Sequence, residues 1–196
     1  MSFFFFDPPG CVFIRIRKAG STSVIRGLFG DKSNARRESS DGTWYPEFDG
    51  RFVFAFVRNP FSRMISCLQM FRGYKTRTLE EQRFKESLTL DRLMDVIEDE
   101  KLPIGGDGYM AKLRLHAVPM THPFYCIDRA EYIGRFERFE QDYREVARLL
   151  GIRVWSVPHE RKSAPMDYRP WFSAAQRRRA ERLLAADLDR FGYRFE

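Results

Sequence analysis

The sequence predicts an α/β fold in which helices flank a central, mostly parallel β-sheet in three layers. Two observations carry this prediction. Short apolar runs typical of buried strands alternate with segments of helical periodicity, and no repeat or low-complexity tract interrupts this alternation. The length of 196 residues suits one domain with a sizeable core, so we expect a single domain over residues 1–196.

The composition points to an anionic ligand. Lys and Arg number 34 against 27 Asp and Glu, which gives a formal net charge of +7. Such an excess is typical of proteins that bind a polyanionic small molecule, a nucleic acid or an acidic membrane surface. Composition alone leaves all three open.

The cysteines and the first ten residues indicate a soluble, cytoplasmic protein. Cys11, Cys67 and Cys126 have neither a CxxC nor a metal-type spacing, so we expect buried thiols in a reducing compartment. The start MSFFFFDPPG has a short apolar run without a basic region before it, so we expect neither a signal peptide nor a membrane anchor. No other apolar run approaches the length of a membrane span.

Four segments are expected to be strands. The clearest is RFVFAFV, residues 51–57, which is almost wholly apolar, as central parallel strands are. Three shorter runs of the same kind are CVFIRI (11–16), EYIGRF (131–136) and IRVWSV (152–157). The polar residues 31–50 show little periodicity and are expected to form a surface loop or lid.

Five segments are expected to be helices, and local signals mark where three of them begin. One hydroxyl of residues 21–23 is expected to cap the first helix. Asn59 as N-cap with Pro60 behind it begins the second, and Ser173 with Gln176 forms a capping box for the last. The expected helices cover residues 21–29, 59–74, 90–100, 137–151 and 173–191.

The loop between the first predicted strand and its helix has the residue types of an anion site. Helix N-termini attract anions through unpaired N–H groups and a partial positive charge. Gly20 lets the backbone come close to a ligand, Ser21 to Ser23 add hydroxyl donors, and Lys18 supplies charge. The nucleotide triphosphatase pattern G-x-x-x-x-G-K-[ST] is absent. An ordinary capped helix with basic surface residues is the alternative.

A second basic element follows the strand at 51–57. Arg58 lies at its carboxyl end, where open α/β sheets usually bind ligands. Ser66 comes seven residues after Asn59, about two helical turns, and so lies on the same side of the helix. Arg58 in a structural ion pair is the alternative. Two anion sites on successive strand–helix units favour one ligand with two separated phosphate-like groups.

With these motifs the chain resembles the sulfotransferases that use 3′-phosphoadenosine 5′-phosphosulfate (PAPS), in particular the carbohydrate (Golgi-type) branch and its bacterial relatives. The family motif K-x-G-[ST]-[ST]-[ST] is matched by KAGSTS at 18–23, and VR-[DN]-P-x-x-R-x-x-S by VRNPFSRMIS at 57–66. YIGRFERFEQDY and LDRFGYRF resemble later family segments, so the resemblance covers nearly the whole chain. It implies a P-loop-like fold.

The resemblance also implies roles for individual residues. Lys18 would stabilise the charge that develops on the bridging oxygen, Arg58 and Ser66 would hold the 3′-phosphate, and no metal would be required. Lys162 and Ser163 match a segment that closes over the nucleotide, although Arg161 replaces the family's asparagine. The residues implied in donor binding are Arg17, Lys18, Ala19, Gly20, Ser21, Thr22, Ser23, Arg58, Ser66, Lys162 and Ser163.

The acceptor hydroxyl needs a general base. His116 occupies the place of a histidine common in the carbohydrate branch and is the leading candidate. His122, or a carboxylate of the 41–49 segment such as Glu47 or Asp49, is the alternative. The acceptor is expected to be a small molecule or a glycan that contacts residues 31–50 and 74–125, where Trp44 could stack on a sugar.

Two other functions fit parts of the sequence less well. A phosphate-loop kinase would need the other order of glycine and lysine and an acidic strand end for magnesium. A nucleic-acid binding module would need a zinc, helix-turn-helix or RNP-type pattern, and none is visible. The basic run at 176–182 is expected to be the solvated face of the last helix. We therefore expect neither a nucleic-acid partner nor an integral membrane segment.

Overall fold

The computed structural model describes residues 2–158 and 167–196, which form parts of two compact units. The first, called the sheet unit, contains the chain up to Arg58 and the segment that begins at His122. The second, called the helical unit, contains Asn59–Thr121 and the C-terminal segment. Each of the two predicted anion motifs begins in the sheet unit, and the second continues into the helical unit.

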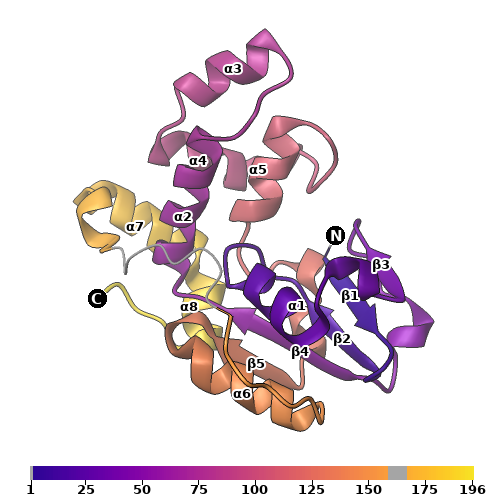
Figure 1. Ribbon diagram of the computed structural model, residues 1–196. Coiled ribbons are helices and arrows are strands. Elements are labelled where there is room, and N and C mark those ends of the chain that lie inside the picture. The colour runs from indigo at the N-terminus through magenta and orange to yellow at the C-terminus, as the bar shows by residue number, and fades with distance from the viewer. Residues whose placement is uncertain (1, 159–166) are drawn as a thin grey trace. The chain divides into compact units, whose positions relative to one another are not determined.

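A five-stranded sheet forms the centre of the sheet unit (Figure 1). Its strand order is β3-β1-β2-β4-β5, and β2, β4 and β5 are parallel while β1 pairs antiparallel with both of its neighbours. The strands are β1 (Phe3–Phe6), β2 (Cys11–Ile14), β3 (Arg37–Ser39), β4 (Phe52–Val57) and β5 (Tyr132–Arg135). The predicted α/β class is confirmed, and so are the strands expected at 11–16, 51–57 and 131–136.

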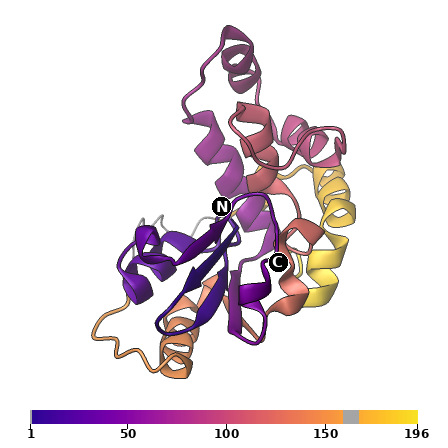
Figure 2. The same cartoon turned by 90° about the vertical axis from the view of Figure 1, so that its right-hand side faces the viewer.

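One face of the sheet carries a row of phenylalanines. Strand register puts Phe4 beside Phe13 and Phe13 beside Phe54, so their side chains lie on the same face. Helices α1 (Ser21–Phe29) and α6 (Phe139–Leu149) both pack against this face (Figures 1 and 2). This layer fixes where α1 begins and therefore where the predicted anion loop lies.

The segment 31–50 is more ordered than the predicted loop or lid. It contains the edge strand β3 and the 3-10 turns η1 (Lys32–Asn34) and η2 (Pro46–Phe48). Phe48 is fully buried against Phe3 and Phe5 on the other face of the sheet. This arrangement could not be predicted from the sequence. A three-residue edge strand needs no apolar alternation, and Phe48 is the one phenylalanine of the segment that is buried against the sheet.

Two strand assignments differ from expectation. The run of four phenylalanines at residues 3–6 was not predicted to be a strand and forms β1. Residues 152–157 were expected to be a strand and are not one, which corrects that prediction. The N–H of Ile152 instead donates to the carbonyl of Ala147 at 2.8 Å, so the chain folds back on α6 and leaves Trp155 84% exposed.

The described residues of the helical unit form six helices, which pack around one apolar core. Its helices are α2 (Pro60–Arg72), α3 (Leu79–Glu86), α4 (Leu90–Glu98), α5 (Tyr109–Ala117), α7 (Ala174–Leu183) and α8 (Ala185–Phe191). The helices expected at 59–74 and 90–100 are confirmed, whereas α3 and α5 were not predicted. The capping box of Ser173 and Gln176 is present, but Leu184 divides the last helix into α7 and α8. None of the helices described has both the length and the apolar character for crossing a bilayer.

Candidate active site

The loop between β2 and α1 adopts a backbone that favours glycine. Lys18 has φ 66° and Gly20 has φ 81°, both in the left-handed region. A Cβ on Gly20 would lie 2.9 Å from the ring of Phe139 and 3.2 Å from that of Phe136. The close approach that Gly20 permits is therefore to two aromatic rings, which place the loop against the start of α6 and the 3-10 turn before it.

The N-cap of helix α1 is a glycine, which has no side chain to accept a capping hydrogen bond. Gly20 is the N-cap, and the predicted cap by a hydroxyl of residues 21–23 is wrong, since these residues form the first helical turn. This turn contains no acidic residue. The N-terminus of α1 thus has the partial positive charge that an anion site requires; of the three hydroxyl-bearing side chains beside it, Thr22 is half-buried and Ser21 and Ser23 are buried.

An arginine that the sequence analysis overlooked lies at the base of this loop. Arg15, just after β2, donates from Nε to Oγ of Ser21 at 3.3 Å. Burial, together with the positive charge of Arg17, lowers the pKa of Arg15 to about 10, so the side chain remains a cation at neutral pH. The signal was present in the sequence, because a charged residue interrupts the apolar run CVFIRI at the point where the strand ends.

Arg58 connects the end of β4 to the loop that follows β2. Arg58 as a whole residue is only 7% exposed. Its Nη1 donates to the carbonyl oxygen of Lys18 at 3.3 Å, and its guanidinium carbon lies 4.5 Å from the centre of the Phe136 ring. The meeting follows from topology, since β2 and β4 are parallel neighbours and both end at this edge. The sheet unit therefore brings Arg58 and the Lys18 loop together, and Arg58 also has a structural role.

The rest of the second motif begins helix α2 in the helical unit. Oδ1 of Asn59 accepts hydrogen bonds from the N–H groups of Phe61 and Ser62, both at 3.1 Å, which confirms the predicted N-cap. Ser66 lies half-buried about two turns further along the helix. Its predicted contact with the donor's 3′-phosphate stays a prediction, as do the roles of Lys162 and Ser163, which lie outside the described residues.

His116, the leading candidate for the base, lies in the last turn of α5 in the helical unit. Its Nδ1 is 2.7 Å from the carbonyl oxygen of Lys112. A carbonyl only accepts, so Nδ1 carries the hydrogen and the lone pair of the neutral ring is on Nε2. The ring packs edge-on against Phe71, with 5.2 Å between ring centres. The imidazole is held in one orientation and in the tautomer that a base at Nε2 needs.

The alternative bases have structural partners in the sheet unit. Nδ1 of His122 accepts from the N–H of Phe124 at 3.1 Å, so that nitrogen serves as a cap. Glu47 pairs with Arg37, and Asp49 accepts from Nη1 of Arg129 at 3.2 Å. Glu47 and Asp49 are thus each already paired with an arginine side chain.

Trp44, which the sequence suggested could stack on a sugar, contacts the ion pair of Asp49 and Arg129. Its Nε1 donates to Asp49 at 2.9 Å, and the guanidinium of Arg129 lies 4.5 Å from the ring centre. The Trp44 ring also meets Phe3 and Phe48 edge-on. Trp44 thus fastens the 40–50 segment to the sheet unit.

Arg179 departs from the solvated face expected at 176–182. Its guanidinium contacts the carboxylates of Asp91, Asp95 and Glu98 on α4. The hydrogen bonds that Arg179 donates to Glu98 and Asp95 raise its pKa above the usual arginine value. This residue therefore fastens α7 to α4, while Arg177 pairs along the helix with Glu181 as a surface residue does.

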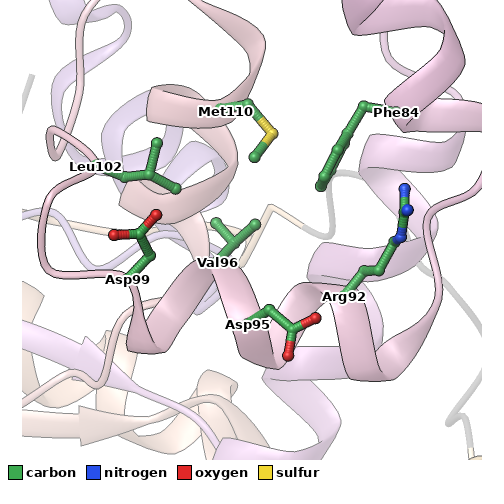
Figure 3. Close-up of a pocket in the computed structure, with 7 residues that line it drawn as sticks. All are labelled: Phe84, Arg92, Asp95, Val96, Asp99, Leu102 and Met110. Carbon is green, nitrogen blue, oxygen red and sulfur yellow. The ribbon is translucent and has the colours of Figure 1, made fainter.

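The helical unit also contains a cavity of about 270 Å³, drawn in Figure 3. It has apolar walls and a charged margin, and its lining residues are Phe84, Arg92, Asp95, Val96, Asp99, Leu102 and Met110. The charges at the margin have partners: Asp95 accepts from Arg179 at 2.6 Å, and Arg92 lies over the Phe84 ring. None of the residues predicted to bind the donor or to act as the base lines this cavity, although its lining lies within the range 74–125 that was expected to contact the acceptor. Within residues 2–158 and 167–196, no group of three or more His, Cys, Asp or Glu side chains gathers as a metal site would.

Comparison with known proteins gives two matches. Residues 1–194 match the family model described as the sulfotransferase family. Among solved structures, the chain is similar to the crystal structure of a sulfotransferase from Alicyclobacillus acidocaldarius, at 20% identity and a TM-score of 0.37. That match covers 76% of this chain and 59% of the solved chain, so this chain spans less than two thirds of it. No curated protein matches the chain.

Proposed function

The chain belongs to the sulfotransferase family, a family of transferase enzymes, and we propose that it moves a sulfuryl group from PAPS to a hydroxyl acceptor. The observation that carries the proposal is the contact of Arg58 with the carbonyl of Lys18. It joins a residue of each anion motif at one edge of the sheet.

The charges around this edge fit the donor. Arg15, Arg17, Lys18 and Arg58 all lie on or beside the loop, and the N-terminus of α1 adds its partial charge. A phosphate monoester carries about two negative charges at neutral pH, and PAPS has its phosphate groups in two separate places. Paired cationic sites therefore suit this donor better than a nucleic-acid backbone, which would call for a longer basic surface.

Each motif would hold a different part of the donor. The first-turn N–H groups of α1 and the hydroxyls of Ser21 to Ser23 would bind the 5′-phosphate, and Arg58 with Ser66 would bind the 3′-phosphate. Bound PAPS supplies the activated sulfuryl group. Lys18 would stabilise the negative charge that grows on the bridging oxygen, the kind of electrostatic effect that usually contributes most to catalysis.

The transfer needs no covalent enzyme intermediate. The acceptor oxygen attacks the sulfur in line, a new S–O bond forms, and the S–O bond to the 5′-phosphate breaks with its electron pair leaving on adenosine 3′,5′-bisphosphate. The acceptor proton would go to Nε2 of His116, because the Nδ1–H bond to Lys112 assigns the lone pair to that nitrogen. We propose a small molecule or a glycan as acceptor, with residues 31–50 and 74–125 contributing to its binding.

The test is transfer of labelled sulfate. The purified chain is incubated with ³⁵S-labelled PAPS and a panel of glycans, lipids and phenols, and the products are separated. The proposal predicts label on at least one hydroxyl-bearing acceptor, together with release of adenosine 3′,5′-bisphosphate. Transfer of γ-phosphate from labelled ATP, with no use of PAPS, would establish a kinase instead.

A further inference from the structure

Arg63, a buried arginine of the second motif, has no role in the reaction described above but contacts the segment that contains His116. Arg63 is 1% exposed and lies on α2, three residues before Ser66. Its Nη2 donates to the carbonyl oxygens of His116 at 3.0 Å and Val118 at 2.9 Å. The last carbonyls of a helix have no partner within the helix, and Arg63 supplies one at the end of α5. It thereby fixes the backbone of the candidate base.

Two other contacts hold the imidazole of His116 itself. Nδ1–H donates to the carbonyl of Lys112, and the Phe71 ring of α2 packs against the imidazole. Phe71 is in turn tied to α5, because the hydroxyl of Tyr109 donates to the Phe71 carbonyl at 2.9 Å. Helix α2 therefore touches His116 at both its backbone and its ring.

The chain after His116 is held by a second buried charge. Asp187 of α8 is fully buried and accepts from the N–H groups of Met120 and Thr121, each at 2.8 Å, and from the Thr121 hydroxyl at 2.8 Å. Arg63 and Asp187 thus fix the backbone of residues 116–121 from two different helices. Buried charges are costly unless they are hydrogen-bonded, and both Arg63 and Asp187 form hydrogen bonds with this segment.

We propose that Arg63 is a positioning residue for His116. One helix, α2, carries both Ser66, which would hold the donor, and Arg63, which fixes the base. Since residues three apart lie on neighbouring positions of a helix surface, the two side chains have a fixed spacing. The proposal rests on the proposed function and on His116 as its base. Arg63 then acts on proton transfer from the acceptor and leaves donor affinity unchanged.

The test is a double-mutant cycle of Arg63→Met and His116→Ala, with kcat and donor KM measured for each variant. A general base misplaced by an ångström can cost about a hundredfold in rate, so we expect Arg63→Met to lower kcat by about ten- to a hundredfold. Donor KM should stay within about threefold. In the His116→Ala background the same substitution should change kcat by less than about twofold, because no base remains to be positioned.

Arg72 offers a matched control. It lies on the same helix and donates from Nε and Nη2 to one backbone carbonyl, that of Leu88, at 3.2 and 3.1 Å. Arg72→Met should therefore leave kcat unchanged. If Arg63→Met does not fold, Arg63→Lys replaces it in the double-mutant cycle. Its ammonium can keep one of the two hydrogen bonds to the carbonyls, so it should retain part of the wild-type kcat.

The outcomes separate the positioning role from the reaction itself. An equal loss of kcat from Arg63→Met in both backgrounds would mean a general structural role and would overturn the proposal. Full activity of His116→Ala would show that His116 is not the base and would overturn the positioning role of Arg63, but it would leave the proposed sulfuryl transfer standing. Absence of transfer in the wild-type protein would overturn the proposed function, and the proposal with it.

Discussion

The guanidinium of Arg58 donates a hydrogen bond of 3.3 Å to the carbonyl oxygen of Lys18. These residues are forty positions apart and belong to the two motifs that the sequence suggested for the two ends of the donor. Their contact follows from the parallel pairing of β2 with β4, which puts both strand ends at one edge. It also means that Arg58 supports the conformation of the loop on which Lys18 stands.

Substitution of Arg58 and Lys18 should separate binding from chemistry. Arg58→Ala removes a charge-assisted hydrogen bond that is equal in the ground and transition states, so donor KM should rise by about one to two decades, or about 1.5–3 kcal/mol. Because Arg58 also supports the Lys18 loop, kcat should fall as well, but by less than in Lys18→Ala. Lys18→Ala should lower kcat by about a hundredfold or more, because the Lys18 ammonium stabilises negative charge on the bridging oxygen that develops only during transfer. Steady-state kinetics with varied donor concentration measures both.

Arg51 is the control for Arg58. It lies just before the other end of β4, over the ring of Phe5 at 5.4 Å. Arg51→Ala should leave both constants unchanged. If Lys18→Ala kept a near-normal kcat and only weakened donor binding, Lys18 would be an anchor for the donor and the catalytic charge would have to come from another residue.

Gly20→Ala should destabilise the protein by more than the same change at Gly50. Both glycines have positive φ, 81° and 70°, and an alanine there costs about 1–2 kcal/mol. The new methyl at position 20 would also meet the Phe139 ring at 2.9 Å, and overpacking adds about 1–3 kcal/mol, whereas at Gly50 no atom lies within 4 Å. Urea denaturation of both variants measures the free energies of unfolding, and equal losses would contradict the tight contact at Gly20.

Sulfuryl transfer should continue in excess EDTA. The reason is that arginine and lysine side chains and the N-terminus of α1 provide the positive charge that magnesium supplies in phosphoryl transfer. The measurement is the rate of ³⁵S transfer with and without the chelator. A rate that falls with EDTA and returns with magnesium would favour the kinase mechanism.

Local signals in the sequence predicted much of the fold. Asn59 followed by Pro60 and the pair Ser173 and Gln176 mark helix starts through hydrogen bonds between near neighbours, and the structure contains both caps. The apolar run 51–57 likewise predicted β4, because a strand buried on both faces needs no polar alternation.

Features that depend on distant residues escaped prediction. The contact of Gly20 with Phe139 and the burial of Arg15 arise only when α6 and β1 pack beside the loop. Residues 152–157 have strand-like composition, but after a turn that follows α6 most of their apolar side chains pack on the core of the sheet unit without joining the sheet. The buried position of Arg63 was similarly invisible, since the motif identifies the arginine without showing that it reaches the end of α5.

We propose that the two motifs bind one donor with two phosphate-bearing ends, and the binding of adenosine 3′,5′-bisphosphate tests this most directly. Calorimetric titration of the wild-type protein and Ser66→Ala with this nucleotide and with adenosine 5′-monophosphate gives the four affinities. We expect the bisphosphate to bind at least about tenfold more tightly than the monophosphate, and Ser66→Ala to reduce that ratio, because one hydrogen bond to a charged group contributes about 1.5–3 kcal/mol. Equal affinities of the wild-type protein for both nucleotides would contradict the roles of Arg58 and Ser66.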